Sequence, residues 1–252
     1  MRLLITGLSG TLAPKLAAAA CAAGHEVIGW DHRALGPEDA DRGAAWLQAQ
    51  RPQAMAHLAL GPVSWAARLA AHAAAHDVPF VFTSTAMVFH HVPDGPHRAG
   101  DARTAQDDYG RYKIACEDAV RAAYPAACIA RLGWQIDADA RGNNMLAQLD
   151  QRQAREGRIG ASRRWRPACS FMEDTARALL ALIETRAGGV VHLDSNAHEG
   201  HDFDAIVRAL AVRFERPHWQ VQAEDDYTHD QRLVGDEVRM PPLTAHLPRL
   251  RG

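Results

Sequence analysis

Lysine is almost missing from this chain of 252 residues. The sequence holds 28 lysines and arginines together, but only Lys15 and Lys113 are lysines. Arginine is therefore the default cation, so a lysine marks a position where a compact amine matters, because the planar guanidinium fork has a different geometry. Lys113 stands four residues after Tyr109, at the end of the run Tyr109-Gly110-Arg111-Tyr112-Lys113.

Cysteine, long apolar runs and net charge are scarce as well. The four cysteines are far apart with no Cys-x-x-Cys spacing, which predicts reduced, mostly buried thiols in a cytoplasmic protein. They are Cys21, Cys116, Cys128 and Cys169. No apolar run reaches the roughly 20 residues of a membrane span, and the glycine-rich start does not fit a signal peptide. The net charge of −2 gives no electrostatic reason to expect nucleic acid or a membrane surface as a partner.

Histidine is plentiful, with 14 residues, but it forms no ligand pattern. The nearest approach to a cluster is His90-His91 with His97, in a loop rich in proline and glycine. They stand in this loop and not on a predicted helix, so the sequence predicts no metal site.

What the chain does have is an alternation of short apolar runs and alanine-rich helical stretches. The apolar runs lie near residues 3–6, 26–31, 54–59, 78–85, 127–132 and 190–193. This order predicts an α/β fold with a Rossmann-type, doubly wound parallel sheet and a small C-terminal substrate-binding region. We expect the dinucleotide-binding core in residues 1–133, completed by about 168–194. The substrate-binding region would comprise residues 134–167 and 195–252.

A glycine-rich turn joins the first strand to the first helix. Gly7 and Gly10 allow a tight turn, and the backbone N–H groups around Ser9 with the positive helix end can hold a pyrophosphate. A strand-to-helix turn without a ligand is the alternative. Asp31 ends the second strand, where a carboxylate can bind the adenosine ribose, which favours NAD. Arg33 could instead bind a 2′-phosphate, so NAD and NADP both stay open, and Asp31 could also be an ordinary turn residue.

Further polar groups lie at the carboxyl ends of later strands, where ligands bind in such sheets. Leu58 and Ala59 follow the third strand, and Thr83-Ser84-Thr85 end the fourth. Thr104 is predicted to cap the next helix, which carries Tyr109 and Lys113 on one face, since residues four apart align. A nearby ammonium lowers the pKa of a phenol, so Tyr109 could exchange a proton near neutrality. A surface helix with no chemistry is the alternative.

Taken together, these residues resemble the extended short-chain dehydrogenase/reductases, and among them the dTDP-4-dehydrorhamnose reductase-like enzymes of nucleotide sugars. The matching pieces keep their order over nearly the whole chain. They are Thr6-Gly7-x-x-Gly10-x-x-Ala13, His57-Leu58-Ala59, Ser84-Thr85-x-x-Val88-Phe89, Tyr109-Gly110-x-x-Lys113-x-x-x-Glu117, Arg131-Leu132-Gly133-Trp134, Phe171-x-x-Asp174-x-Ala176 and Val191-His192-Leu193.

The resemblance implies three catalytic roles. Tyr109 would protonate a substrate carbonyl oxygen as hydride arrives at carbon, or accept the proton in reverse. Lys113 would hold the nicotinamide ribose and stabilise ionised Tyr109, and Thr85 would donate a hydrogen bond to the reacting oxygen. On the substrate side the resemblance points to Ser84, Asn144 and Arg166, although the basic loop around Arg166 could equally be a solvated surface.

Two departures from the family pattern set this chain apart. The segment between Leu60 and Phe80 is short, and Ser64-Trp65-Ala66-Ala67 stands where the family has an Asn-containing proton relay. His90-His91 replaces a small turn. Both departures predict a substrate pocket unlike that of the rhamnose-pathway enzyme.

The sequence is therefore compatible with three functions. The first is an NAD(P)-dependent oxidoreductase acting on a keto or hydroxyl group of a sugar, most simply a nucleotide-linked one, in a protein that could form a homodimer. The second is a sugar-nucleotide epimerase or dehydratase on the same fold. The third is a non-catalytic NAD(P)-binding sensor or scaffold, which would bind the dinucleotide without turnover.

Overall fold

The computed structural model describes residues 1–139, 142–235, 238 and 240–251, which form two compact units. Unit 1 comprises Met1–Val88, Ala105–Arg131 and Ala176–Val191. Unit 2 takes the remaining described residues of Phe89–Thr104, Leu132–Thr175 and His192–Gly252. The chain thus leaves and re-enters each unit several times, so neither is a continuous stretch of sequence.

Within the described residues, six strands form the central sheet that the alternating pattern predicts. They are β1 (Arg2–Thr6), β2 (Glu26–Gly29), β3 (Ala54–His57), β4 (Phe80–Thr85), β5 (Cys128–Leu132) and β10 (Gly189–Leu193). Their order is β10-β5-β4-β3-β1-β2, and β1 pairs in parallel with both β2 and β3. The order reverses after β2, which creates the switch point beside the first glycine turn. The predicted Rossmann-type α/β fold is confirmed.

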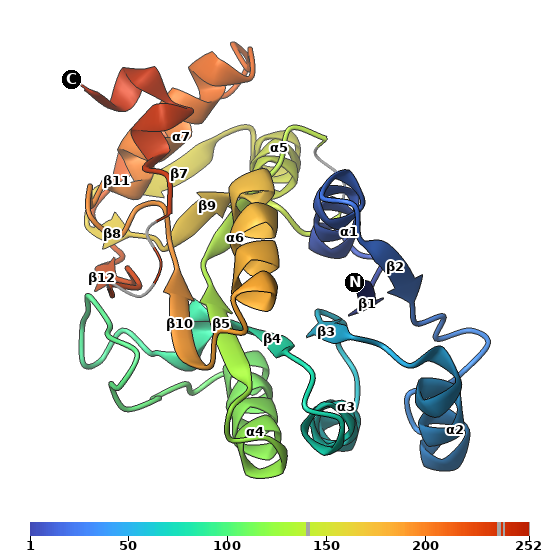
Figure 1. Cartoon of the computed structure of the whole chain (residues 1–252). Helices are drawn as coiled ribbons and strands as arrows, with labels where there is room; N and C mark the ends of the chain where they lie inside the picture. The colour runs from blue at the N-terminus through green and yellow to red at the C-terminus, as the bar shows by residue number, and fades with distance from the viewer. Residues whose placement is uncertain (140–141, 236–237, 239, 252) are drawn as a thin grey trace. The chain divides into compact units, whose positions relative to one another are not determined.

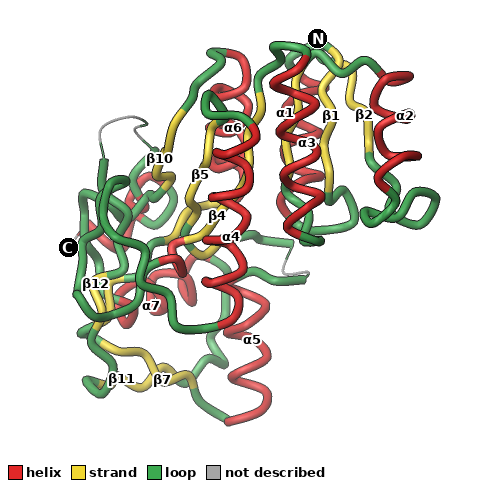
Figure 2. Tube along the Cα trace, turned by 90° about the horizontal axis from the view of Figure 1, so that it is seen from below, coloured by secondary structure: helices red, strands yellow, loops and turns green. Residues whose placement is uncertain are grey.

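Helices cover both faces of this sheet (Figure 1). Helices α1 (Leu12–Ala22) and α6 (Met172–Glu184) lie on one face. The other face carries α2 (Ala40–Gln50), α3 (Val63–Ala75) and α4 (Asp108–Ala123). Buried side chains such as Phe80, Phe82 and Leu69 fill the space on the second face, because strand residues two apart point the same way. The tube in Figure 2 shows α1 running alongside β1.

Unit 2 is built from short paired strands and two helices. The strand pairs are β6 (Trp134–Ile136) with β9 (Cys169–Phe171), β7 (Ile159–Ser162) with β11 (Val221–Glu224), and β8 (Trp165–Arg166) with β12 (His229–Asp230). Helices α5 (Met145–Glu156) and α7 (Phe203–Arg213) supply apolar side chains to its own core, together with Trp219 and Leu243. The described part of the chain also has short 3₁₀ turns at Ala86–Val88, Leu243–Ala245 and Pro248–Arg251. These short strands were not predicted, because runs of two to four residues carry no readable period.

The predicted start of the tyrosine helix was wrong. Helix α4 begins at Asp108 with Asp107 as its N-cap, and the Asp107 carboxylate accepts a hydrogen bond from Gly110 N at 2.8 Å. Thr104 instead accepts from His90 N at 2.9 Å, inside unit 2. Aspartate is as good a cap as threonine, and the sequence offers both within four residues, so local propensity did not choose between them.

Other expectations are met more simply. All four cysteines are free thiols, and Cys116, Cys128 and Cys169 are buried while Cys21 is exposed. Burial raises the pKa of the Cys128 thiol to about 12. Among the helices that the structure describes, none has both the length and the apolar character to cross a membrane.

Candidate active site

The glycine turn after β1 has the shape of a pyrophosphate cradle. Gly7 adopts a φ of +84°, and a side chain there would bring a Cβ within 3.1 Å of Ala59 N. Gly10 N donates to Gly7 O at 2.8 Å, and Ser9 and Gly10 are exposed. Thr11, which precedes α1, makes no side-chain capping bond. The turn therefore presents an uncapped helix start beside a backbone that only glycine allows, which fits a dinucleotide phosphate.

A buried hydroxyl ties this turn to the third strand, and sequence reasoning missed it. Thr6 Oγ1 accepts from Leu58 N at 3.0 Å and from Ala59 N at 3.1 Å. It also lies 2.8 Å from His57 Nδ1, so its single proton goes to that nitrogen. Burial, then the charge of Lys113, lowers the pKa of His57 to about 3. Neutral His57 and Thr6 thus fix Leu58 and Ala59, which the sequence assigned to the cofactor.

The two residues expected to choose the cofactor lie next to each other on the surface. Asp31 and Arg33 are both exposed after β2. Arg33 N donates to Asp31 Oδ1 at 2.9 Å, which makes Asp31 a turn residue as well as an accessible carboxylate. Both alternatives for Asp31 thus coexist, and a carboxylate and a guanidinium stand at the same strand end.

The predicted catalytic groups converge on the end of β4. Tyr109 hydrogen-bonds the Thr85 side chain, and Thr85 Oγ1 accepts from Met87 N at 3.2 Å, which leaves its proton for donation. Lys113 Nζ donates to Thr83 O at 2.9 Å and lies 6.0 Å from the centre of the Tyr109 ring. Lys113 is 3% exposed and Tyr109 40%, so the phenol can meet a ligand while the amine stands behind it.

The expected lowering of the Tyr109 pKa does not occur in this structure. Burial raises that pKa, Asp107 raises it further, and the hydrogen bond with Thr85 only opposes them. Lys113 Nζ bonds the Thr83 carbonyl, and burial with Asp107 outweighs any lowering of the phenol pKa by its charge. Burial lowers the pKa of Lys113 to about 8, against the opposing effects of Cys116 and Glu117. Tyr109 is therefore a protonated phenol at neutral pH, which suits an acid.

The substrate-binding prediction requires an exposed Ser84 side chain beside Thr85, and Ser84 is not exposed. It is 4% exposed, and its Oγ donates to Glu117 Oε1 at 2.5 Å. Side chains alternate along a strand, so Ser84 points the same way as Phe82, toward the helix, while Thr85 points the other way. That alternation was readable in the sequence and would have separated the two hydroxyls.

The two predicted substrate residues of unit 2 have structural partners. Asn144 is 0% exposed and caps α5, accepting from Ala147 N at 3.0 Å. Arg166, in β8, donates to Gly200 O at 3.2 Å, and its guanidinium lies 3.9 Å from Asp230 Oδ2. Its side chain is 53% exposed, so one side of the guanidinium stays accessible.

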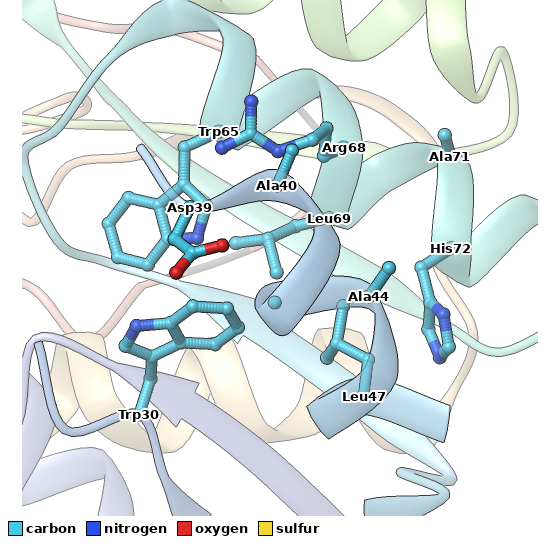
Figure 3. A pocket seen from close by; sticks show the side chains of 11 residues that line it. Trp30, Asp39, Ala40, Ala44, Leu47, Trp65, Arg68, Leu69, Ala71 and His72 are labelled. Carbon is cyan, nitrogen blue, oxygen red and sulfur yellow. The ribbon is translucent and has the colours of Figure 1, made fainter. Parts of the chain in front are cut away.

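The departures from the family pattern also have defined places. Trp65, in the first turn of α3, is buried against Trp30 and lines an apolar cavity of about 310 Å³ between α2 and α3 (Figure 3). None of the predicted site residues lines this cavity. In unit 2, the His97 ring stacks on Phe89 at 4.2 Å. Across the residues described, no group of three or more His, Cys, Asp or Glu is arranged to hold a metal.

Comparisons with a family profile and with curated proteins place the chain in the same family. The RmlD substrate binding domain profile matches residues 63–227. A dTDP-4-dehydrorhamnose reductase of Mycolicibacterium smegmatis is 30% identical over 223 residues, which cover 81% of this chain and 66% of that protein. The chain thus spans about two thirds of that relative's length.

Solved structures show the same fold at lower identity. The dTDP-4-dehydrorhamnose reductase of Bacillus anthracis, solved with NADP, has a TM-score of 0.81 at 17% identity, covering 99% of this chain and 98% of that one. The UDP-glucose 4-epimerase of Thermotoga maritima, solved with UDP-glucose, has a TM-score of 0.70 at 18% identity, covering 92% and 88%. These likenesses concern the fold alone.

Proposed function

The chain belongs to the RmlD substrate binding domain family, and on that premise we propose that it is an NAD(P)-dependent oxidoreductase acting on a keto or hydroxyl group of a nucleotide-linked sugar. The observation that carries the proposal is the convergence of Tyr109, Thr85 and Lys113 at the end of β4. The same unit holds the glycine turn. The names of the reductase relatives support the substrate class.

The chain's own residues define the parts of the reaction. Gly7, Ser9 and Gly10 would hold the pyrophosphate of the dinucleotide, and Asp31 or Arg33 its adenosine ribose. A bound reduced nicotinamide would supply the hydride to the carbonyl carbon. Leu58 and Ala59, fixed by Thr6, would border the cofactor on the other side of the turn.

Proton transfer falls to the tyrosine. Tyr109 gives its proton to the carbonyl oxygen as the carbon–hydrogen bond forms, so the carbonyl becomes an alcohol and the phenol a phenolate. Thr85 donates a hydrogen bond to the same oxygen, and the Lys113 ammonium stabilises the phenolate. Because its pKa is raised, Tyr109 starts protonated at neutral pH, which favours the direction of carbonyl reduction.

We assign the substrate side to unit 2, with Arg166 as a candidate for the diphosphate. Its partly exposed guanidinium supports this role, and its contacts with Gly200 and Asp230 limit it. The buried free thiols Cys116, Cys128 and Cys169 fit a reducing compartment such as the cytoplasm. A homodimer stays a proposal drawn from the family resemblance.

A substrate panel separates the three functions. The protein is mixed with NADH or NADPH and with dTDP- and UDP-linked 4-keto sugars, and the absorbance of the reduced nicotinamide is followed. We expect that absorbance to fall in step with the alcohol formed. Sugar conversion without net absorbance change would indicate an epimerase or dehydratase, which recycles its hydride. Tight dinucleotide binding without any conversion would indicate the sensor.

A further inference from the structure

Beneath the predicted catalytic groups lies the buried carboxylate of Glu117, which accepts hydrogen bonds from two strands. Glu117 Oε1 accepts from Ser84 Oγ at 2.5 Å and from Arg131 Nε at 3.0 Å. Glu117 Oε2 accepts from the second guanidinium arm of Arg131 at 2.9 Å. The three residues are 4%, 1% and 2% exposed in the order Ser84, Glu117 and Arg131. Strand β4, helix α4 and strand β5 therefore meet at one fully desolvated ion pair.

This network continues the contacts that hold the catalytic face of α4. Lys113 and Glu117 are one turn apart, so both point toward β4. Lys113 Nζ bonds the carbonyl of Thr83, and Glu117 bonds the side chain of the next residue, Ser84. The residue after that, Thr85, bonds Tyr109. Three consecutive residues of β4 thus bond three successive turns of α4. Displacement of one of these contacts would strain the others.

The carboxylate also acts on the lysine through space. Burial lowers the pKa of Lys113 to about 8, and Cys116 and then Glu117 oppose that lowering. A lysine with that pKa is close to losing its charge under ordinary conditions, so a neighbouring anion decides how much of it stays protonated. The titratable and charged groups around Lys113 include Tyr109, Tyr112, Cys116 and Glu117 on α4 and His57 on β3, with Arg131 of β5 paired to Glu117.

A buried ion pair could also be purely structural. Desolvation of both charges often cancels their attraction, so such a pair is weak evidence for stability and is frequently neutral when replaced by apolar residues. The structural alternative predicts effects on unfolding only. A positioning role predicts, in addition, a change in the protonation of Lys113.

We propose that Ser84, Glu117 and Arg131 are positioning residues of the active site. The network holds the catalytic face of α4 against the end of β4 and keeps Lys113 charged. Its meaning for catalysis rests on the proposed function, whereas its effect on Lys113 does not. Ser84 is thereby moved from the substrate contacts, where the sequence placed it, to this network.

The scarcity of lysine makes the proposal directly measurable. With isotope-labelled lysine, the protein gives signals from Lys15 and Lys113 alone, and Lys15→Arg assigns them. In the wild-type chain we expect Lys113 to titrate near 8 and, in Glu117→Gln, at least about half a pH unit lower. Lys15 serves as the internal reference. An unchanged Lys113 midpoint in Glu117→Gln would overturn the proposal, whether or not the enzyme turns over any substrate.

Two further variants guard against a simple folding defect. Glu117→Gln leaves the Arg131 guanidinium buried without its counter-charge, so the double variant Glu117→Gln/Arg131→Met removes both charges. We expect the thermal midpoint of the double variant to recover while the Lys113 midpoint stays low. If the thermal midpoint and the Lys113 titration midpoint both recover in the double variant, the pair is structural and the positioning role is contradicted. Asp150→Asn, which breaks the ion pair with Arg216 in unit 2, is the matched control and leaves Lys113 unchanged.

Kinetics then link the network to turnover. In Ser84→Ala, which keeps the ion pair, we expect kcat to fall about fivefold or more with little change in KM, because alignment with the reacting oxygen is lost. In Glu117→Gln the alkaline limb of the kcat profile moves to lower pH together with the lysine titration. Wild-type kcat in Ser84→Ala would remove Ser84 from the network. If the wild type converts no sugar while Lys113 still shifts, the proposed function fails and the network stands.

Discussion

Unit 1 and unit 2 use their predicted site residues in different ways. In unit 1 several groups expected at the site are available at strand ends and helix starts, since Ser9 and Asp31 are exposed and Tyr109 is partly so, whereas Ser84 is buried. In unit 2 the corresponding side chains already have protein partners. Asn144 caps a helix from a fully buried position, and the Arg166 guanidinium pairs with Asp230. Motif spacing identifies chemistry where a strand and the following turn fix the geometry. It says much less where short loops decide which side chain is free.

The largest expected effect on ligand binding comes from the glycine turn of unit 1. In Gly7→Ala, the added Cβ meets the backbone of Ala59 at 3.1 Å and the residue must keep a φ of +84°. We expect dinucleotide affinity, measured by titration calorimetry, to fall about a hundredfold. Gly24→Ala is the matched control, since Gly24 has a φ of +80° with no atom within 4 Å of its Cβ. Equal losses in both variants would mean that strain, and not the cradle, is responsible.

A smaller effect concerns the buried support of the same turn. His57 has a pKa of about 3 in the fold against 6.5 unfolded, so the unfolded chain binds more protons between these values. Stability is therefore lost as pH falls, by about 2 kcal/mol between neutrality and pH 5. His57→Asn, whose Oδ1 can still accept from Thr6, removes this slope in urea unfolding. An equally steep acid slope in that variant would assign the proton uptake to other groups.

The smallest effects separate the two predicted residues of unit 2. Asn144→Ala removes a helix cap and costs about 1 kcal/mol of stability, with KM for the sugar nucleotide unchanged. Arg166→Gln, at a half-exposed side chain, changes stability by less than about 1 kcal/mol. A diphosphate role for Arg166 predicts a KM rise of about tenfold with kcat kept. If KM stays at the wild-type value, Arg166 is a surface residue of unit 2. Neither predicted residue of unit 2 would then bind substrate, in contrast to the exposed groups of unit 1.

The sequence was sufficient for the sheet and for the proximity of Tyr109 and Lys113, for physical reasons. Buried parallel strands are continuous apolar runs, and the four-residue spacing of Tyr109 and Lys113 places them on one helix face. It was insufficient where tertiary contacts decide. Burial, the main cause that raises the Tyr109 pKa, depends on tertiary packing, so that pKa was predicted in the wrong direction.

Other misses were readable in principle. Strand alternation separates Ser84 from Thr85, and the spacing of Lys113 and Glu117 aligns both with β4. The partner of Glu117, Arg131, lies on a different strand, and no local pattern connects the two. Thr6 likewise finds Leu58 and Ala59 only because β1 and β3 are neighbours in the sheet.

The most direct test of the account is hydride transfer in Tyr109→Phe. That variant keeps the ring and the glycine turn but cannot supply the proton, so dinucleotide affinity stays within about threefold of wild type while kcat falls by 10²–10⁴ as an order of magnitude. The measurement is single-turnover transfer of deuterium from labelled reduced nicotinamide to the sugar carbon, beside a binding titration. Transfer at the wild-type rate in Tyr109→Phe would contradict the claim that this phenol is the acid.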